Sequence, residues 1–173
     1  MTNVETQLAT YFAKYEPAIA ELGTALRTKL RARLPGLFEI VYVYQNQNAL
    51  VISYSPTERG YEAVCSISVR PRLVQLAFGK GAQLSKWDPN RLLQGQGKTV
   101  RHVELNAVAD FDRAEIESLI AAAVKLAQVR LDPNAKGAVI IKADEQKQRA
   151  RRATTAAQST APRRPKARQS EKT

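Results

Sequence analysis

The spacing of apolar residues constrains the fold of this chain most, because the spacing changes its period twice along the sequence. Residues 4–34 repeat apolar side chains every three or four positions, which is the period of a helix. Residues 38–105 hold five short runs in which apolar side chains alternate, the period of a strand, and residues 116–131 return to the helical period. All but one of the connections between the five runs are short, which favours antiparallel pairing. The sequence therefore predicts an α+β fold, a two-layer sandwich with an antiparallel sheet of about five strands and N- and C-terminal helices on one face.

Local signals predict where the helices begin and end. Pro17 suits the first turn of a helix, since the N–H that it lacks would have no partner there. The pair Pro35 and Gly36 ends that helix. Asp112, three residues before Glu115, is expected to open the last helix as an N-cap.

The charge balance changes near residue 132. Residues 1–132 carry 16 Lys and Arg against 13 Asp and Glu, whereas residues 133–173 carry 11 against 3, which divides the net charge of +11 into +3 and +8. Apart from a short apolar patch at residues 138–141, the second part is mostly Ala, Thr, Gln, Lys and Arg. Such a composition buries too little surface to offset the entropy cost of ordering. We expect a folded domain over residues 1–132 and a basic disordered tail over residues 133–173.

The sequence indicates a cytoplasmic protein that does not enter the membrane. Cys65 is the single cysteine, so no internal disulfide can form, and the N-terminus lacks the basic start and apolar stretch of a secretory signal. No apolar run approaches the roughly 20 residues of a membrane-spanning helix. The oligomeric state stays open.

The letters GQGKT at residues 95–99 are similar to the end of a nucleotide-binding loop, but the spacing excludes that reading. The motif requires glycine where Leu92 stands, and it must lead into a helix rather than into the strand-like run at residues 100–105. No nucleophile–base pair, metal-ligand set or cofactor motif is visible elsewhere, so we expect a non-enzymatic domain with no metal site.

Residues 78–105 nevertheless suggest an anion site. Four of the eight glycines lie there, next to or near cations: Gly79, Gly81, Gly95 and Gly97. Glycine turns expose backbone N–H groups that approach an anion closely. The candidate ligand-binding residues are Lys80, Lys98, Arg101 and His102. The alternative is a set of solvated cations beside two turns, with His102 paired to a strand neighbour.

Two segments carry a resemblance to a known family. LAFGKGAQL at residues 76–84 and DPNRLLQGQGKTVRHVEL at residues 88–105, followed by an acidic-capped final helix, resemble the YdhG-like domain family, with residues 11–127 covered. The resemblance implies a frataxin-like sandwich and an intracellular binding or carrier domain, and one branch of the family is linked to iron delivery. Iron would require acidic side chains on the first helix, yet Glu5, Glu16 and Glu21 stand there among Lys and Arg. Iron is thus implied by the resemblance alone, and the residues predict no cofactor.

The tail offers a function of a different class. Its basic residues could neutralise the phosphates of nucleic acid or another polyanion without reading sequence. The candidates are Arg151, Arg152, Arg163, Arg164, Lys166 and Arg168. A tail that only keeps the protein in solution is the alternative. Three functions are therefore carried forward: a family-like binding or carrier domain, a nucleic-acid-associated protein, and a domain that binds small anions through its Gly/Lys loops.

Overall fold

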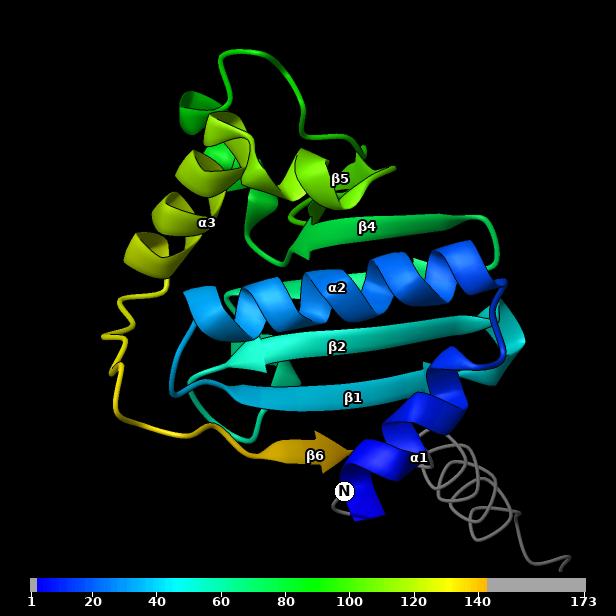
Figure 1. Cartoon of the computed structure of the whole chain (residues 1–173). Helices are drawn as coiled ribbons and strands as arrows, with labels where there is room; N and C mark the ends of the chain where they lie inside the picture. The colour runs from blue at the N-terminus through cyan, green and yellow to red at the C-terminus, as the bar shows by residue number, and fades with distance from the viewer. Residues whose placement is uncertain (1–2, 143–173) are drawn as a thin grey trace, which may run out of the picture. The chain divides into compact units, whose positions relative to one another are not determined.

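The structure is a computed structural model that describes residues 3–142 (Figure 1). The helices are α1 (Asn3–Phe12), α2 (Pro17–Arg33) and α3 (Ala114–Leu126). The strands are β1 (Phe38–Tyr44), β2 (Ala49–Ser55), β3 (Cys65–Arg70), β4 (Leu73–Phe78), β5 (Arg101–Leu105) and β6 (Val139–Ile141). Short 3-10 helices lie in the connections, among them η2 (Gly60–Glu62), η3 (Gly81–Trp87) and η4 (Val108–Asp112). The remainder of the predicted tail, residues 143–173, lies outside the described residues.

The six strands form one sheet in the order β5-β4-β3-β2-β1-β6. Strands β1 to β5 pair antiparallel with their neighbours, and β6 pairs parallel with β1. The predicted α+β class and its five antiparallel strands are confirmed. The tight connections between β1 and β2 and between β3 and β4 explain the pairing of those strands, since only antiparallel strands can be joined by a short turn.

Strand β6 lies within the segment that was expected to be disordered. Backbone hydrogen bonds on either side of β6 join it to β1. The N–H of Glu39 donates to Ala138 O at 2.9 Å, and the N–H of Lys142 donates to Val41 O at 2.8 Å. Val139 and Ile141 also pack against the core. The folded domain thus extends to residue 142, ten residues past the predicted boundary. A three-residue strand is too short to show a period, and its stability comes from a partner about 100 positions earlier in the chain.

The register places one row of apolar side chains across the sheet. The row consists of Val41, Ile52, Ile67, Leu76 and Val103. Helix α2 lies over this face and runs along the strands (Figure 1). Ion pairs join it to η4 and α3 through Lys29–Asp112 and Arg33–Glu117. All three helices contribute buried side chains to a single core. Within residues 3–142, none of the three α-helices lies on the other face of β1 to β5, as in a two-layer sandwich.

Arg27 joins α1, α2 and β1 through a charged network. Its guanidinium lies 2.7 Å from Glu5 of α1 and 2.6 Å from Glu39 of β1. The hydroxyl of Tyr54 donates to Glu39 at 3.0 Å. Hydrogen bonding from Arg27 lowers the pKa of Glu5, whereas burial raises the pKa of Tyr54 well above its usual value. The network fixes α1 against the body of the domain.

One predicted helix start was wrong and another was confirmed. Helix α3 begins at Ala114 without a side-chain cap, because Asp112 belongs to η4 and its carboxylate instead binds Lys29 Nζ at 2.7 Å. Asp110 takes the capping role for η4, since it accepts hydrogen bonds from two backbone N–H groups. Pro17 is the first residue of α2, as expected, and the helix ends at Arg33, before Gly36 with its left-handed φ of 84°.

Candidate functional site

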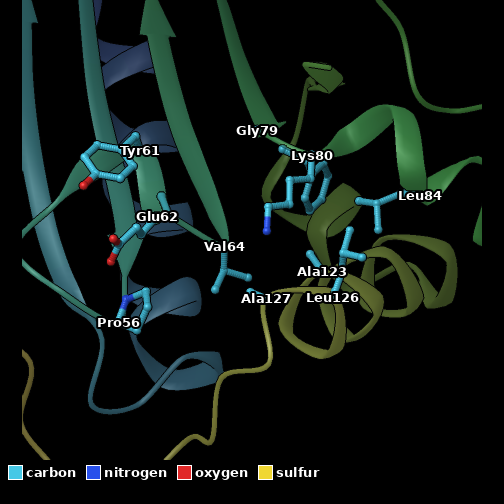
Figure 2. A pocket seen from close by; sticks show the side chains of 12 residues that line it. Pro56, Tyr61, Glu62, Val64, Gly79, Lys80, Leu84, Ala123, Leu126 and Ala127 are labelled. Atoms are coloured by element: carbon cyan, nitrogen blue, oxygen red, sulfur yellow. The ribbon is translucent and has the colours of Figure 1, made fainter. Parts of the chain in front are cut away.

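A cavity of about 420 Å³ opens at the end of the sheet where β2 and β4 finish (Figure 2). We call it the α3 pocket. Three segments far apart in the sequence form its walls: the β2–β3 connection, the turn from β4 into η3, and the C-terminal half of α3. Its apolar wall consists of Val64, Phe78, Leu84, Ala123, Leu126 and Ala127. A volume of this size lies in the range of small-molecule sites.

The β2–β3 connection is held in place by the last residue of β2. The fully buried hydroxyl of Ser55 donates to Arg59 O at 2.8 Å and accepts from the N–H of Thr57 at 3.3 Å. The chain then forms η2 and rejoins the sheet where the N–H of Val64 donates to Tyr54 O at 2.8 Å. The connection therefore presents a fixed wall to the cavity.

Lys80 is the cation that lines the α3 pocket. Figure 2 shows its side chain extending from the end of β4 into the cavity toward Val64. Its ammonium group makes no hydrogen bond or ion pair within residues 3–142. A charge of this kind, next to an apolar wall, is available to an incoming anion.

The opposite wall carries Tyr61 and Glu62 (Figure 2). Tyr61 lies at the rim, with 78% of its surface exposed, the largest exposure among the large apolar side chains of the described domain. Glu62 already has partners, because it accepts from the Thr57 hydroxyl at 2.6 Å and lies 3.7 Å from Arg59. The carboxylate of Glu62 is thus partly neutralised, whereas Lys80 is not.

The other three predicted anion-binding residues, Lys98, Arg101 and His102, do not line the α3 pocket. The structure does bring the two glycine turns together: the N–H of Ala82 donates to Thr99 O at 2.8 Å, and a Cβ on Gly81 would lie 2.5 Å from Arg101 Cβ. Yet Arg101 uses one guanidinium nitrogen to donate to Gly97 O and Val100 O, and it does not line the α3 pocket.

Lys98 and His102 also lie apart from Lys80. Lys98 is exposed in the turn before β5, with no side-chain partner in the part of the chain that the structure describes. His102 points to the sheet face opposite Arg101, and its backbone pairs with Gln94 through hydrogen bonds of 2.7 and 3.0 Å. Lys80 alone of the four predicted residues therefore lines the cavity.

Sequence reasoning missed the remaining lining residues because they come from three separate segments. One local signal was present: Tyr61 is an aromatic residue next to Gly60 in a polar connection between strands. The tail residues proposed for nucleic acid, Arg151, Arg152, Arg163, Arg164, Lys166 and Arg168, lie outside the described residues.

The described domain offers no clustered metal ligands. Within residues 3–142, no group of three or more His, Cys, Asp or Glu side chains is arranged to hold a metal ion. Cys65 is buried, and burial raises the pKa of its thiol to about 12. None of the helices within residues 3–142 combines the length and the apolar composition of a membrane span.

Comparison of the chain with known protein families, curated proteins and solved structures found no match. The resemblance to the YdhG-like family stays an expectation from the sequence.

Proposed function

We propose that this domain binds a small organic acid with an apolar body in the α3 pocket. The observation that carries the proposal is the position of Lys80, an ammonium group that forms no ion pair or hydrogen bond within residues 3–142, beside an apolar wall. The carboxylate of the ligand would pair with Lys80 while its apolar body covers Val64 and Leu126. Both contributions are favourable, since buried apolar surface gives about 25 cal/mol per Å² and an ion pair strengthens as water is excluded.

The lining groups support binding rather than chemistry. Lys80 and Glu62 are the strongly ionisable groups of the cavity, and Glu62 is held by Thr57 and Arg59. Tyr61 at the rim supplies an aromatic surface that can cover the ligand. We therefore propose a binding or carrier role, of the kind that the family resemblance also implies.

The proposal is tested by titrating the full chain with octanoate and, separately, with 1-octanol, which has the same apolar body without the charge. We expect octanoate to bind more tightly and to shift the amide resonances of Val64, Lys80 and Leu126. Lys80→Gln should weaken octanoate binding about tenfold, the equivalent of roughly 1.4 kcal/mol for one lost ion pair. It should leave the affinity for octanol unchanged.

Lys98→Gln is the matched control, because it removes the same charge from an exposed turn that does not line the cavity. Ala127→Phe, at the half-exposed end of α3, should fill the cavity and abolish binding of both compounds. Equal affinity of the parent protein and Lys80→Gln for octanoate would contradict the assignment of Lys80. Failure of both compounds to bind would reject the pocket as a site for this class of ligand.

A further inference from the structure

A second hollow, of about 610 Å³, lies between η3, residues 88–93 and the start of β5. Helix η3 separates it from the α3 pocket, since Leu84 lines the pocket and Ser85 lines the hollow. The polar side chains that line the hollow are Ser85, Asp88, Arg91 and Arg101. We call it the arginine hollow.

A tight turn sets the position of Arg91. The buried carboxylate of Asp88, 8% exposed, accepts hydrogen bonds from the N–H groups of Leu92 and Leu93, each at 2.8 Å. The N–H of Arg91 donates to Asp88 O at 3.2 Å, and the φ of Arg91 is 55°. Side chains other than glycine rarely adopt this left-handed conformation. The turn thus holds Arg91 at the hollow in a left-handed backbone conformation, which glycine or asparagine would adopt at a lower cost in free energy.

Both arginines have unused hydrogen-bond donors. The guanidinium of Arg91 makes no hydrogen bond or ion pair with any side chain or carbonyl in residues 3–142. Arg101 uses Nη1 for the carbonyls of Gly97 and Val100, and its Nε and Nη2 donate to no described residue. Asp88 is the acid that lines the hollow, and both of its oxygens are occupied by backbone N–H groups. Two guanidiniums and one carboxylate therefore line the hollow, which leaves it a net positive charge, and neither arginine forms an ion pair with Asp88 or with any other acid of residues 3–142.

We infer that the arginine hollow binds the terminal phosphate of a small phosphomonoester. A guanidinium presents paired N–H groups that match two oxygens of a phosphate, and two guanidiniums complement its double negative charge near pH 7. This site is independent of the organic-acid site, because Lys80 does not line it. The same phosphate chemistry occurs in the diesters of nucleic acid, which carry a single charge for each phosphate.

The test is a calorimetric titration of the full chain at fixed ionic strength with glycerol 3-phosphate, dimethyl phosphate and a short single-stranded oligonucleotide. We expect the monoester to bind and the dimethyl ester to bind at least tenfold more weakly. Affinity for the monoester should fall as the pH drops below about 6, where the phosphate loses its second charge. Equal binding of monoester and diester, or binding of the oligonucleotide alone, would overturn the inference.

Variants separate the hollow from the rest of the basic chain. Arg91→Gln should raise the Kd for glycerol 3-phosphate tenfold or more, and Arg91→Gly should do the same while relieving the left-handed conformation, so that loss of folding does not explain the result. Arg72→Gln, at an exposed position in the β3–β4 turn, removes the same charge elsewhere and should leave the Kd unchanged. Unchanged affinity in both Arg91 variants would reject the hollow as the site.

Discussion

At the scale of single residues, Arg27 determines how three elements meet. Burial alone would lower the pKa of its guanidinium, but the hydrogen bonds and charges of Glu5 and Glu39 outweigh burial and raise it. The side chain is thus a permanent cation inside the domain, with 9% of its surface exposed, and Glu39 beside it is 3% exposed. A buried charge is tolerated only when it keeps its partners.

We predict that Glu39→Gln lowers the free energy of unfolding by on the order of 3 kcal/mol, because Arg27 would lose one of its two acidic partners and Tyr54 would lose a charged acceptor. The measurement is chemical denaturation of the full chain. Asp112→Asn is the matched control: it removes a carboxylate from the half-exposed pair with Lys29 and should cost less than about 1 kcal/mol. Equal losses for the two variants would show that the network stabilises no more than a surface pair does.

At the scale of elements, β6 depends on a close approach between two backbones. A Cβ placed on Gly137 would lie 1.6 Å from Leu37 O, so no larger residue fits while residues 138–142 remain paired with β1. Glycine at position 137 therefore allows the connection from α3 to pass close to Leu37 and enter β6. Gly79, by contrast, has open space around the position of a Cβ.

Gly137→Ala should therefore detach β6 and destabilise the domain by about 1–3 kcal/mol, the usual cost of forced overpacking. Hydrogen exchange should show the loss, since the amides of Glu39 and Lys142 donate across the β1–β6 ladder. Gly79→Ala should leave both amides protected. If the two amides stay equally protected in Gly137→Ala, the pairing of β6 does not depend on this contact.

At the scale of the whole molecule, both candidate sites lie around η3, at loops that the sheet positions. The basic residues beyond β6 form a separate feature. Residues 143–173 hold nine Lys and Arg against three Asp and Glu, whereas residues 1–142 hold 18 against 13. A charge excess of this kind attracts polyanions without sequence preference.

We predict that the full chain binds labelled duplex DNA weakly, and that its affinity falls steeply between about 50 and 200 mM salt as counterions are released. A chain ending at Lys142 should bind far less and show a shallower salt dependence. The cut belongs after Lys142 rather than after Asp132, because the earlier cut would remove β6. Identical affinity and salt slope for the two chains would mean that the basic segment contributes nothing to binding.

The sequence by itself determined the helical segments near both ends of the domain, the strands β1 to β5, and the alternation that turns one face of the sheet toward the core. Side-chain direction follows the local period of the backbone, so the spacing of Ile52, Ile67 and Leu76 was enough to predict a half-buried antiparallel sheet. The start of α2 at Pro17 was predictable for the same reason, because it depends only on neighbouring residues. Lys80 was also identified, from the glycines on either side of it.

Only the tertiary structure decided which distant residues meet. Periodicity does not distinguish an exposed arginine from Arg27, whose acidic partners lie 12 and 22 positions away. In the same way, it could not place Lys80 and Tyr61 in one pocket, or Arg91 and Arg101 in one hollow, because those combinations depend on the path of the intervening chain. The short strand β6 gave no period of its own, since its stability comes from β1. Local spacing fixes the direction of a side chain, and the packing of the whole domain fixes its partners.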